Sequence, residues 1–243
     1  MNAFSDPDSR TYARLTGALY LLIAVAGGFS IAFVPSQLQV AGDAAATFDN
    51  ILARRGLFHL GIAGDVVMMV AEIMVTAMLF HMFERVNRTL SLAAALARFA
   101  MVTVMAAMLF FHVAALNLAA PDSLLTTFTP AQRIDLAGLM LTVHDAGVWI
   151  WQIFFTVHLA LLGVLVARSG SYPALLGGAL AVGGFGYLLD SIYAFAAPDM
   201  AWLGHLRVGL LVIVTLAELS FALWLLLRGP RSVPTDPGSL HAE

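Results

Sequence analysis

The sequence predicts an all-α membrane protein, built as a bundle of six transmembrane helices. Hydrophobic residues make up 60% of the 243 residues and charged residues only 11%, whereas soluble domains carry about 25% charge. In addition, six apolar stretches are each long enough to cross a hydrocarbon core, which takes about 20 helical residues. These stretches are Ala13–Val34, Leu57–Phe83, Leu92–Leu118, Leu136–Ala167, Ala174–Ala196 and Leu203–Leu227.

The first stretch is expected to be an uncleaved helix, because it is longer than the roughly 7–15 apolar residues of a signal peptide. Pro35 should end it. Asp43 then offers an N-cap for a short amphipathic helix that follows it. That helix either lies at the outer membrane interface or packs on its own bundle.

Turn residues separate the remaining stretches. Asn87-Arg88 marks a tight turn, and Thr129-Pro130 should open the fourth helix after the longest loop. A turn over 169–173 and Pro198-Asp199 provide the last two connections. The chain is therefore expected to have a cytoplasmic tail over 1–12 and one membrane domain over 13–228, with an interfacial segment over about 43–56. A disordered cytoplasmic tail over 229–243 should follow.

Arginines near the helix ends predict the orientation. One side would carry Arg10, Arg14, Arg85, Arg88, Arg168, Arg228 and Arg231. The other would carry Arg54, Arg55, Arg133 and Arg207. Because positive residues are enriched in cytoplasmic loops, the larger group predicts that both termini lie in the cytoplasm.

The fifth stretch is rich in glycine. Its glycines are Gly177, Gly178, Gly183, Gly184 and Gly186. Small residues let membrane helices approach closely, so this helix is expected to press against at least one neighbour. The last three glycines also offer a point where the helix could break, as discontinuous helices do in transporters.

Ionisable residues interrupt the apolar stretches. Each costs about 2.5–3.5 kcal/mol at the bilayer centre on insertion scales, and usually marks a pathway, a ligand site or a buried pair. Within the stretches, five carboxylates accompany a single arginine, Arg98. These carboxylates are Asp65, Glu72, Asp145, Asp190 and Glu218. Arg207, close to the start of the last stretch, is assigned to the loop before it. The excess acids must be protonated, paired with histidine, hydrated or bound to a cation; alternatively, the polar groups only fix helix register.

Helical spacing places several polar residues on shared faces. Asp65 and Glu72 are seven residues apart and point the same way. In the third stretch, one stripe comprises Arg98, Met101, Met105, Met108 and His112. In the fourth, one face comprises His144, Trp151, Phe155 and His158, and Asp145 lies beside it.

These faces suggest two sets of site residues. The ligand- or ion-binding set is Asp65, Glu72, Arg98, Asp190 and Glu218. The metal-ligating set is His112, His144, Asp145 and His158. The sequence has no phosphate-binding glycine loop, H-E-x-x-H or G-x-S-x-G. It also has no cysteine, which excludes disulfides, thiolate metal sites and cysteine nucleophiles.

Short motifs from about Ala13 to Arg228 occur together in a recognisable order. They are A-R-L-T-G-A-L-Y-L-L at 13–22, G-D-A-A-A-T at 42–47, N-I-L-A-R-R-G at 50–56, H-D-A-G at 144–147, R-S-G-S-Y-P at 168–173, G-Y-L-L-D-S at 186–191 and E-L-S-F-A-L-W-L-L at 218–226. Together they resemble a bacterial family of polytopic membrane proteins, domain of unknown function 4386. The chain departs from that pattern at Ala174, where members often carry arginine. The resemblance implies a six-helix protein of the bacterial inner membrane and no established activity.

Four functional hypotheses stay open. The polar cluster could bind or transport a small molecule or ion, with Arg98 capturing an anionic group or the acids coupling to protons or cations. Zinc or iron on His112, His144, Asp145 and Asp190, with Asp65 as general base, would make an intramembrane enzyme. Haem iron between histidines would make a b-type cytochrome. The last hypothesis is a structural or accessory role.

The expected partners follow from the membrane location and the small size of the chain. They are the lipid bilayer, a small-molecule or ion ligand, and a second copy of the chain, because a transporter of this size would need a dimer. A nucleic-acid partner is not expected.

Overall fold

A computed structural model describes residues 6–120, 123 and 125–231. These residues form no strand, which confirms the all-α prediction. The elements are α1 (Arg10–Gly27), a π-helical segment (Gly28–Phe33), α2 (Val34–Leu38), α3 (Ala44–Ala53), α4 (Arg55–Phe83), α5 (Arg88–Ala119), α6 (Pro130–Arg168), α7 (Ala174–Ala196) and α8 (Ala201–Leu227). The C-terminal tail predicted to be disordered, 229–243, lies almost entirely within 232–243, which is outside the described residues.

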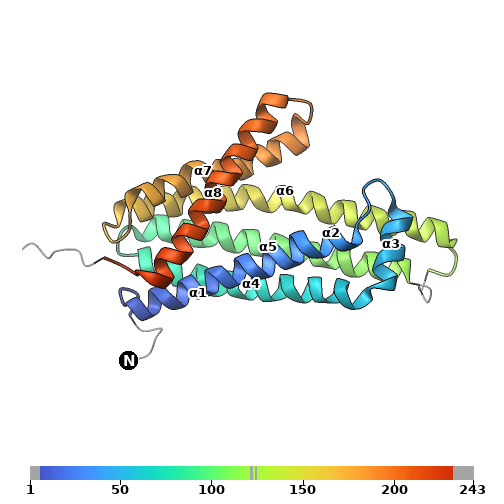
Figure 1. The fold of residues 1–243 in the computed structure, drawn as a ribbon, viewed down its shortest axis with the longest axis horizontal. Helices are drawn as coiled ribbons and strands as arrows, with labels where there is room; N and C mark the ends of the chain where they lie inside the picture. The colour runs from blue at the N-terminus through green and yellow to red at the C-terminus, as the bar shows by residue number, and fades with distance from the viewer. Residues whose placement is uncertain (1–5, 121–122, 124, 232–243) are drawn as a thin grey trace, which may run out of the picture.

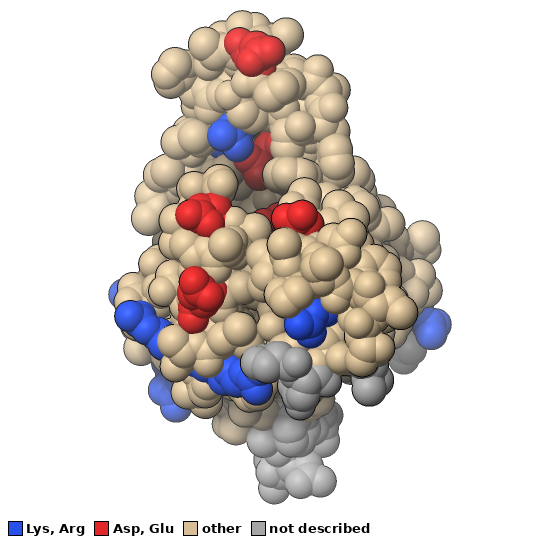
Figure 2. Space-filling model, turned by 90° about the vertical axis from the view of Figure 1, so that its right-hand side faces the viewer, with Lys and Arg blue, Asp and Glu red and all other residues tan. Residues whose placement is uncertain are grey.

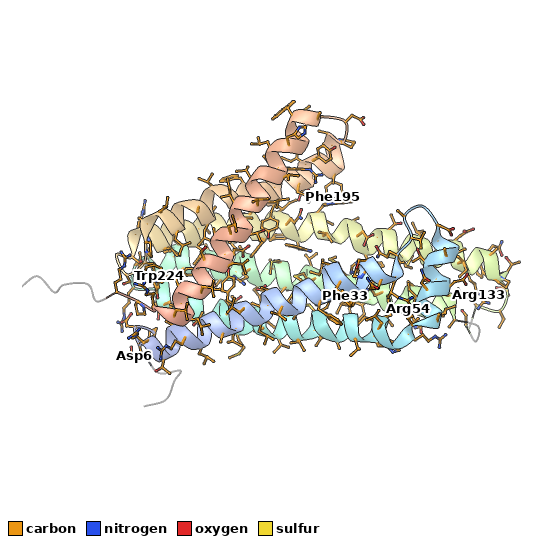
Figure 3. The ribbon with its side chains drawn as sticks, in the orientation of Figure 1. Asp6, Phe33, Arg54, Arg133, Phe195 and Trp224 are labelled. Atoms are coloured by element: carbon orange, nitrogen blue, oxygen red, sulfur yellow. The ribbon has the colours of Figure 1, made fainter. Side chains whose placement is uncertain are left out.

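Among the described residues, six helices are long and apolar enough to cross a membrane, as predicted. The first runs from α1 through α2, and the others are α4 to α8. Each packs on its neighbours in chain order, and α8 returns to α1, so the six spans form a closed ring. In Figure 1, α7 and α8 cross the long bundle obliquely, and their connecting loop projects away from it. Figure 3 shows Asp6 and Trp224 at one end of the molecule and Arg54 and Arg133 at the other.

The first span does not end at Pro35. It continues to Leu38, with Pro35 in the first turn of α2, directly after the π-helical segment. Proline lacks an N–H and its ring crowds the preceding turn of an α-helix. A wider π-type turn accommodates both defects, and such turns are frequent at functional sites. At Pro35, where the helix was expected to end, it instead changes from π-helix to α-helix and continues.

Local capping signals in the sequence are confirmed. The Asp43 carboxylate accepts a hydrogen bond from the backbone N–H of Ala46 at 2.9 Å and starts α3. Thr129 and Gln132 form a reciprocal capping box at the start of α6. Phe48 and Ile51 of α3 are buried, and α3 contacts α2, α4, α5 and α6. The short helix thus packs on its own bundle, and its place at the outer membrane interface stays a prediction.

Glycines let α7 lie against both of its neighbours, as predicted. A Cβ at Gly177 would lie 2.5 Å from the carbonyl oxygen of Gly163 in α6. A Cβ at Gly183 would lie 2.7 Å from the backbone nitrogen of Val214 in α8. The helix is continuous over Ala174–Ala196, so the expected break at these glycines is wrong. In an α-helix closely supported on two sides, glycine serves packing rather than unwinding.

Candidate functional site

Polar side chains from all six spans meet inside the ring. They are Tyr20 (α1), Glu72 (α4), Arg98 (α5), His158 (α6), Tyr187 (α7) and Glu218 (α8). Together they form one continuous chain of hydrogen bonds, which we call the central polar chain.

Arg98 is at the middle of the central polar chain and is fully buried. Its Nε donates to Glu72 Oε2 at 2.5 Å, and its Nη1 donates to the Tyr20 hydroxyl at 3.1 Å. Its Nη2 has no hydrogen-bond partner among the described residues. The guanidinium carbon lies 4.8 Å from the centre of the Tyr20 ring and 5.6 Å from that of Phe155. Cation–π attraction from these rings helps to stabilise the desolvated charge.

The hydrogen bonds of His158 determine its tautomer. Its Nε2 lies 2.9 Å from Arg98 Nη1, and its Nδ1 lies 2.9 Å from the carbonyl oxygen of Ala94. Because arginine only donates and a carbonyl only accepts, Nε2 must accept and Nδ1 must carry the proton. His158 is therefore neutral in this arrangement, and both of its ring nitrogens are occupied.

Glu218 is held only by neutral donors. The Tyr20 hydroxyl donates to its Oε1 at 3.2 Å, and the Tyr187 hydroxyl donates to its Oε2 at 3.4 Å. Its charge is thus not matched by a direct contact with a cation, whereas Glu72 contacts Arg98 directly.

The central polar chain borders a cavity of about 400 Å³, which we call the central cavity. Glu72, Arg98 and Glu218 lie in its wall together with Tyr20 and Tyr187. The rest of the wall is largely apolar and comes from Ile23, Ala24, Ile31, Met68, Met101, Met105, Trp151, Phe155, Leu219 and Ala222, with Thr215. A few converging polar groups in an apolar wall are the usual make-up of a ligand pocket.

A second cavity of about 320 Å³, the outer cavity, lies toward α3. It collects four of the predicted site residues, Asp65, His112, His144 and Asp145. Figure 2 views the molecule from the α3 end and shows acidic residues around a hollow below the projecting α7–α8 loop. The outer and central cavities share Ile31, Met105 and Trp151 in their walls, so they are adjacent along the ring.

The histidines of the outer cavity do not converge on one point. The His112 and His144 rings are stacked with centroids 3.6 Å apart and planes 18° apart. Imidazole lone pairs lie in the ring plane, so two stacked rings direct them side by side and not toward a common ion. His144 Nδ1 also lies 3.2 Å from Asp145 Oδ1. In the described part of the chain, no three His, Cys, Asp or Glu side chains form a group that could hold a metal ion.

The geometry therefore gives the metal and haem hypotheses no support. His158, one of the predicted metal ligands and a haem candidate, uses both nitrogens in hydrogen bonds inside the ring. The remaining candidates, His112, His144 and Asp145, do lie together, but without a converging set of donors.

Asp190 lies apart from the other predicted ligand-binding acids. Its Oδ1 forms an ion pair with Arg207 Nη1, and its Oδ2 accepts from Gln152 Nε2 at 3.0 Å. Arg207 also lies over the Tyr193 ring, 4.1 Å from its centre. This group joins α6, α7 and α8 beside the cavities, and its charges are balanced.

Sequence reasoning missed three participants in these networks. Tyr20 and Tyr187 are uncharged and so escaped a search for ionisable residues, although each interrupts an apolar stretch with a hydroxyl group. Arg207 was counted with the loops, yet it lies in the second turn of α8 and contacts Asp190. A search for every polar side chain inside the spans would have found all three.

Comparisons with known proteins place the chain in a family. A family model described as "Domain of unknown function (DUF4386)" matches residues 15–229. An uncharacterized protein from Archaeoglobus fulgidus is 30% identical over 106 residues, which cover 40% of this chain and 60% of that relative. No solved structure matches the chain. Since the family model covers most of the sequence, the chain belongs to the DUF4386 family.

Proposed function

We propose that this multi-pass membrane protein binds a small molecule or ion in the central cavity. The observation that carries the proposal is the cavity itself, whose wall brings Glu72, Arg98 and Glu218 together inside a ring of six helices. Its volume of about 400 Å³ falls within the roughly 300–1,000 Å³ of small-molecule sites. A polar network that only fixed helix register would not need this space.

The arrangement of the two cavities favours transport over binding alone. Ile31, Met105 and Trp151 lie in the walls of both, so a change in these side chains would connect them. Ile31 belongs to the π-helical segment, a helix type that is often found where a helix rearranges or binds. The outer cavity would then lead toward the α3 end of the protein.

We further propose that the protein resides in the bacterial inner membrane with both termini in the cytoplasm. In Figure 3, Asp6 and Trp224, near the two ends of the described chain, lie at the same end of the molecule. The segments expected on that side carry seven arginines and those on the other side four, and positive residues favour the cytoplasmic side. One chain supplies all the charged residues in the wall of the central cavity, so the proposed binding does not depend on a second copy. The predicted homodimer would serve transport, and native mass spectrometry of the purified protein tests it.

Single-cysteine labelling tests whether the central cavity is open to water. The chain contains no cysteine, so each introduced thiol is labelled alone. Ala24 lies in the wall of the central cavity, whereas its neighbour Val25, which is 71% exposed, does not. Maleimide reacts with the thiolate, which forms in water and not in lipid. In liposomes, Ala24→Cys should react with a water-soluble maleimide at least tenfold faster than Val25→Cys.

The sidedness of labelling separates transport from binding. A transporter should be labelled at Ala24→Cys from either side of the membrane, because its cavity opens alternately to both. A binding protein should be labelled from one side only. Equally slow reaction at both positions would contradict the proposed function and favour a structural network.

A further inference from the structure

The central cavity contains one carboxylate more than it has cations. Glu72 and Arg98 neutralise each other, and His158 is held in its neutral form. Glu218 receives only the hydroxyl groups of Tyr20 and Tyr187. When Glu218 is ionised, the wall therefore carries a net charge of −1. An unpaired charge away from water is costly, so a positively charged ligand would stabilise this cavity.

Three aromatic rings from α6 and α7 cluster in one part of the wall of the same cavity. The ring centroids of Trp151 and Phe155 are 6.1 Å apart, those of Trp151 and Tyr187 are 6.0 Å apart, and those of Phe155 and Tyr187 are 5.1 Å apart. All three side chains line the central cavity. Clusters of aromatic faces attract cations through their quadrupoles and are typical of sites for quaternary ammonium groups.

The rest of the wall favours an organic cation over a metal ion. A hard metal ion needs about six oxygen ligands or retained waters, and no metal-holding group of acids and histidines occurs in the described residues. The wall instead presents methionines and aliphatic side chains, including Met68, Met101 and Met105. Methionine adapts its shape to varied apolar ligands.

From these three observations we infer that the central cavity takes an organic monocation, with its positive charge against Glu218 and the aromatic faces and its apolar part against the methionines. This inference rests on the proposed function, because it names the class of ligand for the same cavity.

Three probes with the same six-carbon chain test the inference: hexyltrimethylammonium, 1-hexanol and hexanoate. Their binding to the full chain in a non-ionic detergent is measured by isothermal titration calorimetry. Hexyltrimethylammonium should bind at least tenfold more tightly than either of the other two. Glu218→Gln should weaken hexyltrimethylammonium binding at least tenfold and leave 1-hexanol binding unchanged. Glu84→Gln, a matched change outside the ring, should alter neither.

A second variant keeps the test independent of how Glu218→Gln folds. Trp151→Leu retains the carboxylate and removes one aromatic face, and it should lower the preference for hexyltrimethylammonium over 1-hexanol at least threefold. Tighter binding of hexanoate, or equal binding of all three probes, would overturn the inference and leave the proposed function standing. If none of the probes binds, the inference fails, and the labelling experiment decides the proposed function separately.

Discussion

Replacing Arg98 with methionine tests the central polar chain, because methionine keeps part of the side-chain length and removes the charge. The change leaves Glu72 Oε2, His158 Nε2 and the Tyr20 hydroxyl without their donor. Arg98 is fully buried and Glu72 is 4% exposed, so both partners of the ion pair are largely removed from solvent. Removing one partner of a buried ion pair costs about 3–5 kcal/mol.

The expected size of the effect follows from the length of the chain. For proteins of 150–250 residues, 1 kcal/mol changes the unfolding temperature by about 2–4 °C. Arg98→Met should therefore lower it by roughly 6–20 °C. The double variant Glu72→Leu/Arg98→Met should recover most of the loss, because replacing both charges by apolar side chains is often neutral or stabilising. The assay is thermal unfolding of the detergent-solubilised protein, followed by tryptophan fluorescence.

The same substitution at an exposed ion pair provides the control. Arg85→Met breaks the ion pair between Arg85 and Asp8, in which the arginine side chain is 73% exposed and the aspartate side chain 62%. Exposed pairs contribute about 0–1 kcal/mol, so the unfolding temperature should change by less than about 4 °C. If Arg98→Met unfolds no earlier than this control, or if the double variant is less stable than the sum of its single changes, the reasoning is refuted.

Three other outcomes are expected. Gly177→Ala should destabilise the protein, because the new Cβ would lie 2.5 Å from a backbone carbonyl oxygen of α6. Gly178→Ala has open space at its Cβ, so this variant should be as stable as the wild type or more stable by about 1 kcal/mol. Equal unfolding temperatures of the two variants would count against the packing of α7. Arg207→Met should lower the free energy of unfolding by about 1–3 kcal/mol, because Asp190 loses its ion pair and keeps only the hydrogen bond from Gln152 as a side-chain contact to another helix. An unchanged unfolding temperature would argue against that ion pair. In ¹⁵N NMR spectra, His158 should show a protonated Nδ1 and an unprotonated Nε2; the opposite tautomer would disprove its contact with Arg98.

Much of the fold could be predicted from the sequence because the signals were local. Hydropathy located the six spans, and side chains at helix starts marked α3 and α6. Helical spacing also grouped residues that the structure places along one surface. Arg98 and Met101 line the central cavity, Met108 and His112 line the outer cavity, and Met105 lies in both walls.

The contacts between helices could not be predicted in the same way. Nothing local indicates that Tyr20 of α1 bonds to both Arg98 of α5 and Glu218 of α8, because this depends on which helices are neighbours in the ring. The pairing of Asp190 with Arg207 across the α7–α8 hairpin escaped the charge count for the same reason. These tertiary contacts separate the central polar chain from the Asp190 group, which the sequence treated as one set.

Small molecules retained by the purified protein give the most direct test of the central claim, that a ligand binds inside the ring. Wild-type protein and two variants, Ala24→Trp and Val25→Trp, are purified alike and extracted for mass spectrometry. Ala24→Trp fills part of the central cavity, whereas Val25→Trp adds the same bulk at an exposed residue outside its wall. A compound that accompanies wild type and Val25→Trp, and is lost from Ala24→Trp, is the predicted result. Identical extracts from all three proteins would contradict the claim.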